Sequence, residues 1–227
     1  MRIRCEYLAG PELKFLSNLD MMRMMERALR RAEIPYALSE GFNPHIKLSM
    51  GTVLPVGLWG KNEYFDLELK NRVSPDWLIQ QLNTVLPPGV KIKRVKEIDY
   101  RQPALMKIIN SAAYAFVLQE ILLADLEQLR EELMQRPDWK VKSRGKKKDV
   151  IKDLKTGIYK IEMKGQGDSV IINLTVATGE PVNIRFDELL DLLLSIGIKE
   201  ENIIDIYREA NYVKIQEKYL TPLEKVI

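Results

Sequence analysis

Polar and apolar residues alternate with a period of two in many stretches of the chain, which predicts a series of β-strands. Apolar residues at helical spacing separate several of these stretches and predict α-helices. The strands are expected at 2–8, 63–69, 90–98, 112–119, 159–164, 169–175 and 203–212, with shorter extended pieces at 36–38, 46–50 and 139–142. The helices are expected at 17–34, 74–86, 124–136 and 186–196.

The helix at 17–34 has clear signals at both ends. The Ser17 hydroxyl can cap free backbone N–H groups, and Asp20 completes a pattern similar to a capping box. The helix is expected to end near Ile34, because the residue before a proline, here Pro35, is pushed out of the helical region. The side chains expected in the core are Met22, Met25, Leu29 and Ala32.

The order of elements in the N-terminal half is β-α-β-β-α-β, the pattern of a ferredoxin-like domain. The C-terminal half repeats this plan in element order only. We therefore predict an α+β protein made of two tandem ferredoxin-like halves with antiparallel sheets. The first domain is expected at 1–103, with a basic helix and a Gly-Phe-Asn-Pro-His loop, and the second at 104–227, with a basic loop at 140–155.

The composition narrows the classes of protein that the chain can represent. A net charge of +3 is only mildly basic, so nucleic-acid binding must be argued from local patches. Cys5 is the sole cysteine and is expected to be a buried thiol, and with one histidine in the chain no metal site and no cofactor are expected. The chain has neither a signal-peptide apolar region nor the ~20-residue apolar run that spans a bilayer, so we expect a cytoplasmic protein without membrane contact.

Four arginines of the first helix, Arg23, Arg27, Arg30 and Arg31, recur at steps of three and four residues, so much of this set shares one helix face. Guanidinium groups present forked donors that suit phosphate oxygens. One interpretation is therefore an anion site. The other is a solvated face, with Glu26 paired to Arg30.

The loop at 41–45 holds the histidine of the chain. Gly41 is expected to supply an unusual backbone angle, and Asn43 lies beside a proline that stiffens the turn. Phe42 either stacks on a base or fills the core. His45 is the candidate catalytic residue, as a general acid or base, and its alternative role is a structural hydrogen bond.

The segment 140–155 is the strongest basic run, and its centre holds Lys146, Lys147 and Lys148. A loop of this kind suits a polyanion, because each neutralised phosphate releases counterions. The alternative is a solvated loop that binds nothing specific. On the strand at 63–69, Asp66 and Glu68 point to one face, where they either coordinate a cation or are solvated, and we expect Glu63 in the same set.

The N-terminal half resembles the radical-SAM-linked protein family of bacteria. The residues that carry the resemblance are 15–20, Arg23, 27–32, 41–45, 54–57 and 63–66, with a weaker match at 153–155. The resemblance implies a module encoded beside, or fused to, a radical SAM protein, often near RNA-processing genes. Asn18 and Ile46 depart from the histidine and proline common in the family, so a role that needs two histidines is not expected here.

Three functions follow from these residues. The leading hypothesis is an RNA-binding or substrate-presenting accessory module that works with a radical SAM partner on tRNA or ribosomal RNA, and that is not itself an enzyme. The second is an RNA-processing or nucleotide-modifying enzyme that uses His45 and the arginine face. The third is a protein-interaction adaptor that makes no contact with RNA.

Overall fold

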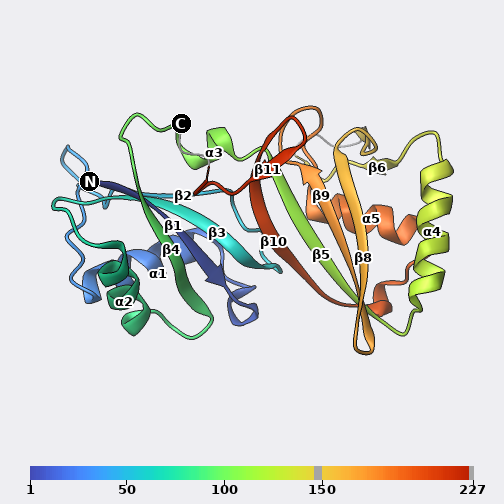
Figure 1. Ribbon diagram of the computed structural model, residues 1–227, viewed down its shortest axis with the longest axis horizontal. Helices are drawn as coiled ribbons and strands as arrows, with labels where there is room; N and C mark the ends of the chain where they lie inside the picture. The colour runs from blue at the N-terminus through green and yellow to red at the C-terminus, as the bar shows by residue number, and fades with distance from the viewer. Residues whose placement is uncertain (146–149, 225–227) are drawn as a thin grey trace. The chain divides into compact units, whose positions relative to one another are not determined.

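A computed structural model describes residues 1–145 and 150–224 (Figure 1). The chain forms two compact units. The first unit comprises Met1–Ile109 together with Ala210–Ile227, and the second comprises Asn110–Glu209. The domain limits expected from the sequence, 1–103 and 104–227, differ from these units mainly at the C-terminus, which belongs to the first unit.

The first unit is built on a small antiparallel sheet with the order β4-β1-β3, to which β2 is added along β3. Its strands are β1 (Arg2–Ala9), β2 (Leu48–Met50), β3 (Trp59–Glu68), β4 (Val90–Ile98) and β11 (Lys218–Leu220), and its helices are the 3-10 helix η1 (Pro11–Leu13), α1 (Asn18–Arg31), α2 (Pro75–Val85) and α3 (Leu105–Ile108). Strand β10 (Ile203–Ile215) begins in the second unit and ends in the first.

Helix α1 begins as the sequence predicts, with Ser17 accepting a hydrogen bond from the Asp20 backbone N–H at 3.2 Å. It ends at Arg31, earlier than expected. Glu33 adopts a left-handed conformation, with φ of 51°, and the Ile34 N–H donates back to the Leu29 carbonyl. This is the Schellman arrangement, which ends the helix before Pro35 restricts the backbone.

One face of the first sheet packs on α1 and α2. Ile3 and Cys5 of β1 lie in a core with Met25 and Leu29 of α1, and burial raises the pKa of the Cys5 thiol. The expected core position Met22 is only half-buried, and its place is taken by Met21 and Met24. In Figure 1 both helices lie below the strands, whereas α3 and the C-terminal segment lie above them.

The second unit has the strand order β10-β5-β9-β8 and a separate two-stranded sheet, β6-β7. Its strands are β5 (Ser111–Gln119), β6 (Lys140–Lys142), β7 (Ile151–Asp153), β8 (Ile158–Gln166) and β9 (Ser169–Ala177), and its helices are α4 (Leu123–Gln135), α5 (Phe186–Ser195) and the 3-10 helix η2 (Glu200–Asn202).

The α+β class and the antiparallel pairing are confirmed. The finer expectation of two tandem ferredoxin-like halves stays a prediction, because β6-β7 stands between α4 and the β8–β9 hairpin, outside a β-α-β-β-α-β plan. Strand β7 lies in a charged run and α3 is one turn long, so neither has a clear periodic signal. No helix in the described part of the chain is long and apolar enough to cross a bilayer.

Candidate functional site

The exposed face of α1 carries the predicted arginines. Arg23, Arg27 and Arg30 follow one another at four and three residues, so their Cα atoms cover about 10 Å of the helix axis. All three side chains are exposed, as is that of Arg31. We call Arg23, Arg27 and Arg30 the arginine stripe.

The members of this set differ in their partners. Arg30 lies 3.7 Å from Glu26, as expected, and Arg31 donates to the Val85 carbonyl at 2.8 Å, at the end of α2. Within residues 1–145 and 150–224, Arg23 and Arg27 make no hydrogen bond or ion pair. Two guanidinium groups therefore remain available to an external anion.

The charges of Arg23 and Arg27 act on the carboxyl group of Asp20, which lies in the first turn of the same helix. The pKa of its carboxyl is lowered chiefly by the hydrogen bond from the Ser17 hydroxyl, at 2.6 Å, and further by the charges of Arg23 and Arg27. Within the described part of the chain, no ion pair joins this carboxylate to either arginine.

The loop at 41–45 joins two short extended arms. Leu38 and Ile46 form an antiparallel bridge. Nearer the tip, two hydrogen bonds join Ser39 and His45. The Ser39 N–H donates to the His45 carbonyl at 2.8 Å, and the His45 N–H donates to the Ser39 hydroxyl at 3.0 Å. Gly41 has φ of 115°, a value that other residues adopt only with strain. The two arms of the loop are therefore held together by their own hydrogen bonds.

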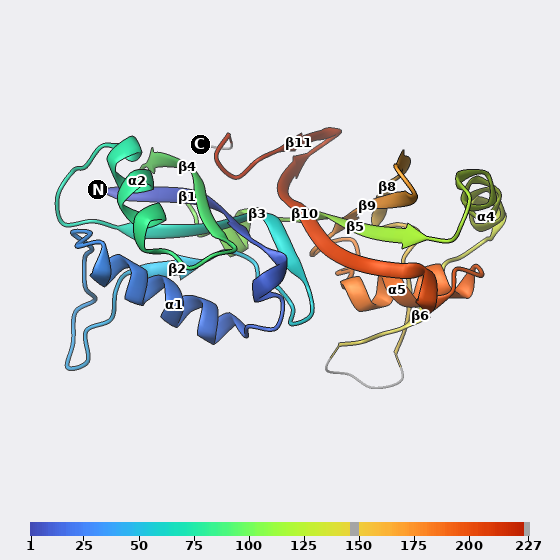
Figure 2. The same cartoon turned by 90° about the horizontal axis from the view of Figure 1, so that it is seen from below.

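The side chains at the tip of this loop are exposed. The Phe42 ring is fully accessible, so the interpretation that it fills the core is wrong. Asn43 and His45 are exposed as well, and no described residue makes a hydrogen bond to the side chain of either. Figure 2 shows the loop between α1 and β2 extending away from the strands, past the C-terminal end of α1.

His45 meets few of the requirements of a general acid or base in this geometry. Its backbone is hydrogen-bonded to Ser39, but no described hydroxyl, thiol or carboxylate contacts its ring. A base normally needs a group that orients it and a reacting group within hydrogen-bond reach. The catalytic role of His45 therefore stays a prediction.

The basic segment of the second unit is anchored by a buried carboxylate that the sequence analysis missed. Glu188 of α5 is fully buried and accepts from the Lys152 ammonium at 2.8 and 3.0 Å. It also accepts from the backbone N–H groups of Arg144, at 2.9 Å, and Arg185, at 3.0 Å. Glu188 thus joins two positions of the basic segment, Arg144 and Lys152, to the first turn of α5.

Other cations of this segment are also neutralised within the unit. Arg144 forms a forked pair with Asp191 at 2.9 and 2.8 Å, which raises the pKa of the guanidinium. Lys140 lies 2.5 Å from Asp138. Lys146, Lys147 and Lys148 lie outside the described residues. The described cations of the segment are thus paired, and polyanion binding by its centre stays a prediction.

The weaker family match at 153–155 is explained by local structure. The Asp153 carboxylate accepts from the backbone N–H groups of Lys155 and Trp139, and these bonds lower the pKa of its carboxyl. The Lys155 ammonium donates to the Arg136 carbonyl at 2.6 Å, and Leu154 is fully buried. This motif therefore holds the chain in place after α4.

Asp66 and Glu68 share one face of β3, as expected, but they do not form a cation site. Buried Asp66 pairs with Arg2 and Arg4, each at 2.7 Å, and Glu68 pairs with Lys47 at 3.1 Å. Asp66, Glu68, Arg2 and Lys47 line an open pocket of about 200 Å³, in which each carboxylate already has a cationic partner.

Glu63 is not part of that set. It lies three residues before Asp66, and an odd spacing along a strand places its side chain on the other face of the sheet. It is buried beside Asn211, whose side chain also contacts Thr52 at 2.8 Å. The expected membership of Glu63 was therefore wrong. Within residues 1–145 and 150–224, no group of three or more His, Cys, Asp or Glu side chains is placed to hold a metal ion.

A second buried carboxylate, Glu6, was also missed. It accepts from the Tyr64 hydroxyl at 2.8 Å and from Arg94 at 2.5 Å, and burial together with the Glu6 charge raises the pKa of Tyr64. Alternation along β1 places Glu6 on the same side as Arg4, which was the signal for a charged face of the sheet. The α3 and C-terminal segments cover this face, with Arg4 donating to the Pro222 carbonyl at 3.2 Å.

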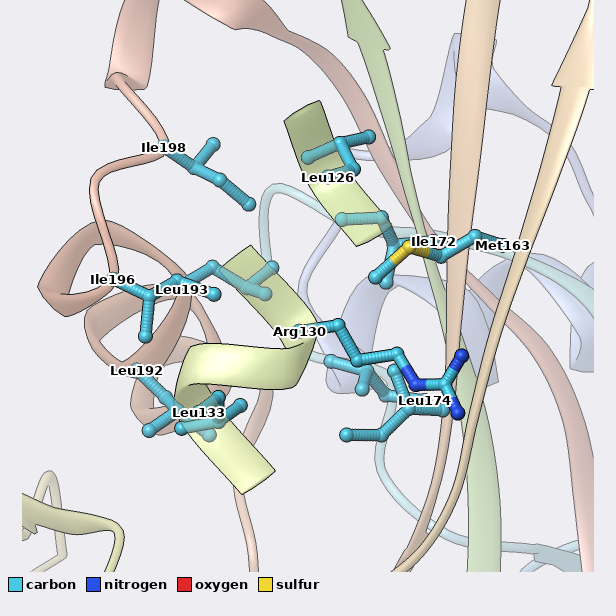
Figure 3. Close-up of a pocket in the computed structure, with 11 residues that line it drawn as sticks. Leu126, Arg130, Leu133, Met163, Ile172, Leu174, Leu192, Leu193, Ile196 and Ile198 are labelled. Atoms are coloured by element: carbon cyan, nitrogen blue, oxygen red, sulfur yellow. The ribbon is translucent and has the colours of Figure 1, made fainter. Parts of the chain in front are cut away.

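A seam in the second unit is lined almost entirely by aliphatic side chains of α4, β8, β9, α5 and the turn that follows α5 (Figure 3). Arg130 is the one charged side chain of its lining. The free space is about 10 Å³, close to the minimum for a single water molecule. The seam is therefore part of the packing of the helices on the sheet and has no room for a ligand.

Comparison with known proteins decides the family. The model of a family described as an uncharacterised protein conserved in bacteria (DUF2344) matches residues 2–186. The chain belongs to this family. The matched region of DUF2344 includes α1, the loop at 41–45 and the basic segment, and it ends at the start of α5.

Two solved structures resemble this DUF2344 chain weakly. One is a chain from the crystal structure of a Cbf5-Nop10-Gar1 complex, with a TM-score of 0.48 and 12% identity over 93% of this chain and 50% of that chain. The DUF2344 chain thus spans half the length of that protein. The other is an unknown protein from Galdieria sulphuraria, with a TM-score of 0.26 and 12% identity over 92% of this chain and 96% of that chain. No curated protein matches. Neither likeness carries an argument about function.

Proposed function

We propose that the chain is an RNA-binding accessory module, with the arginine stripe of α1 as its phosphate contact. The observation that carries the proposal is the state of Arg23 and Arg27, which are exposed on one helix face and make no ion pair or hydrogen bond with a described residue. Adjacent unpaired cations repel each other, and a polyanion that binds both relieves this repulsion.

The geometry favours a chain of phosphates over a single anion. Arg23 and Arg27 are one helical turn apart, so their Cα atoms are separated by about 6 Å along the axis. Each guanidinium can form a forked pair with phosphate oxygens. A row of such contacts along an exposed helix suits a nucleic-acid backbone, which carries charges at regular intervals.

The proposal includes a radical SAM partner, and this part is supported by the sequence resemblance alone. Cys5, the sole cysteine, is buried in the first unit, so the chain cannot supply the three thiolates of a radical SAM cluster. In this proposal the module holds RNA, and the partner performs the chemistry.

A salt titration of RNA binding tests the phosphate contact. Fluorescence anisotropy with a labelled tRNA transcript would compare the wild type with the double variant Arg23→Gln/Arg27→Gln over a range of potassium chloride concentrations. Loss of two phosphate contacts should weaken binding and reduce the slope of log affinity against log salt by about 1.4 to 1.8.

The matched control is Arg72→Gln/Lys91→Gln, which removes the same charge from other exposed positions of the first unit. This control should keep most of the salt slope. Equal effects of the two double variants would mean that only net charge matters, and an unchanged slope in Arg23→Gln/Arg27→Gln would exclude the stripe as the contact.

A further inference from the structure

We infer that the loop at 41–45 recognises an unpaired nucleotide, so that the substrate is RNA with a single-stranded or bulged base and not a continuous duplex. The inference rests on the proposed function and names the substrate class of the same site. It is carried by the Phe42 ring, by the exposed polar side chains of Asn43 and His45 that follow it, and by the position of the loop after α1.

The Phe42 ring lies at the tip of a loop whose two arms are hydrogen-bonded to each other. The Leu38–Ile46 bridge and the two Ser39–His45 hydrogen bonds hold the arms together below the tip. A fully exposed aromatic side chain at such a tip gains nothing from the fold of the unit, because it packs against no core. Both faces of the ring are open for a planar group to stack on.

An unpaired base is the partner in RNA that such a ring can stack on. Bases inside a helix already stack on their neighbours, and the major groove of A-form RNA is too deep and narrow for side chains to read. Loops, bulges and single strands expose base faces, and proteins that bind them commonly stack bases on aromatic rings. The ring therefore favours RNA whose base is free of the helix.

The residues beside Phe42 separate base contacts from phosphate contacts. Asn43 and His45 both offer donors and acceptors for the edge of a base. No described residue forms a hydrogen bond with either side chain. Glu40, exposed just before Gly41, places a negative charge that disfavours a phosphate at the loop itself. Base contacts therefore fall on the loop, and phosphate contacts fall on the arginine stripe.

The loop and the stripe are close in the chain and belong to the same unit. Helix α1 ends at Arg31, and the first arm of the loop begins at Tyr36, which is bridged to Leu69 beside β3. Figure 2 shows the loop beyond the C-terminal end of the helix. One RNA strand whose phosphates follow the stripe can therefore reach the loop with its next bases.

The test compares three labelled RNAs of equal length: a single strand, a hairpin with one bulged nucleotide, and a fully paired hairpin. The wild type should bind the first two at least about fivefold more tightly than the third, the lower end of the stacking effect of one base. Phe42→Ala should remove this preference and leave affinity for the paired hairpin unchanged. Phe42→Tyr should restore it, because the ring is kept.

Phe15→Ala is the matched control, since Phe15 is an exposed phenylalanine of the same unit at the other end of α1. It should not change the preference among the three RNAs. Melting temperatures should be equal for wild type, Phe42→Ala and Phe15→Ala, which separates recognition from stability.

The outcomes distinguish the two proposals. If the wild type binds none of the RNAs, the proposed function is wrong. If it binds all three with a salt slope that depends on Arg23 and Arg27, but without preference and without an effect of Phe42→Ala, the module binds RNA and the inference about unpaired nucleotides is wrong. A Phe42→Ala variant that keeps all RNA binding but loses a protein partner would likewise overturn the inference.

Discussion

The arginine stripe of α1 and the basic segment of the second unit resemble each other in sequence and differ in structure. Both gather cations over a short stretch of chain. Arg23 and Arg27 are exposed and unpaired among the described residues, whereas Lys140, Arg144, Lys152 and Lys155 are each bonded within their own unit. The basic segment has the denser positive charge, and its described cations are bonded to groups of the second unit.

The difference comes from burial of the partners. Glu188 has no exposed surface, and a buried carboxylate requires a cation and hydrogen-bond donors to offset its desolvation. Lys152 and two backbone N–H groups supply them. The carboxylate of Asp20, which the charges of Arg23 and Arg27 influence, is exposed, so its hydration does not depend on an internal ion pair with them.

The largest expected effect is that of Glu188→Ala on stability. The substitution leaves the Lys152 ammonium largely buried without its counter-ion, and breaking a buried pair typically costs about 3–5 kcal/mol. Chemical denaturation of the full chain would show this loss in the unfolding free energy. Asp191→Ala, which removes the more exposed partner of Arg144, is the control and should have a much smaller effect. Equal losses would contradict the anchoring role of Glu188.

The centre of the basic segment is tested by the triple variant Lys146→Gln/Lys147→Gln/Lys148→Gln. If these lysines contact RNA, removing three phosphate contacts should lower the salt slope of tRNA binding by about 2 to 3. Circular dichroism should show an unchanged fold. An unchanged slope would mean that, of the two basic regions, only the arginine stripe can contact RNA.

Asp153→Asn should have a moderate effect. The neutral amide accepts more weakly from the Lys155 and Trp139 N–H groups, and we expect a loss of about 1 kcal/mol at neutral pH. Because these bonds lower the pKa of the wild-type carboxyl, its stabilisation is present above the pKa of the unfolded state and is lost as pH falls through the lower folded value. Denaturation curves of the two proteins should therefore converge in acid, and a difference that grows in acid would be inconsistent with this role.

The smallest effect is expected for Lys140→Gln/Arg144→Gln. Both side chains are exposed and paired with exposed or half-buried carboxylates, so their removal should leave the unfolding midpoint nearly unchanged. The salt slope of RNA binding should stay at the wild-type value, because these cations are already neutralised. If the slope falls as much as in Arg23→Gln/Arg27→Gln, the two regions do not differ in how their cations contact RNA.

Local signals in the sequence were sufficient for many elements. Ser17 caps α1, and Ser74 caps α2 by accepting from the Trp77 N–H at 3.2 Å, because both motifs act within one turn. The β8–β9 hairpin follows from the Gly and Asp residues between two alternating stretches. Such local signals also predict the shared face of the arginines on α1 and the turn at 41–45.

Contacts between distant residues could not be predicted in this way. The bond from Lys152 to Glu188 crosses 36 residues, and that from Arg4 to the Pro222 carbonyl crosses 218. Hydrophobic periodicity says which residues share a face of one element, but it does not say which element covers that face. The exposure of Phe42 belongs to the same class, because an aromatic residue in a turn fits either a core or a surface.

The return of the C-terminal segment to the first unit has a consequence for synthesis on the ribosome. Leu223 packs with Tyr64 and Leu105, and Arg4 donates to the Pro222 carbonyl, so a segment made after the second unit covers a charged face formed by residues made before it. A nascent chain that has released only residues 1–109 exposes that face to water. The first unit is therefore completed only after the whole second unit has been made, in contrast to the domain-by-domain order common in longer proteins.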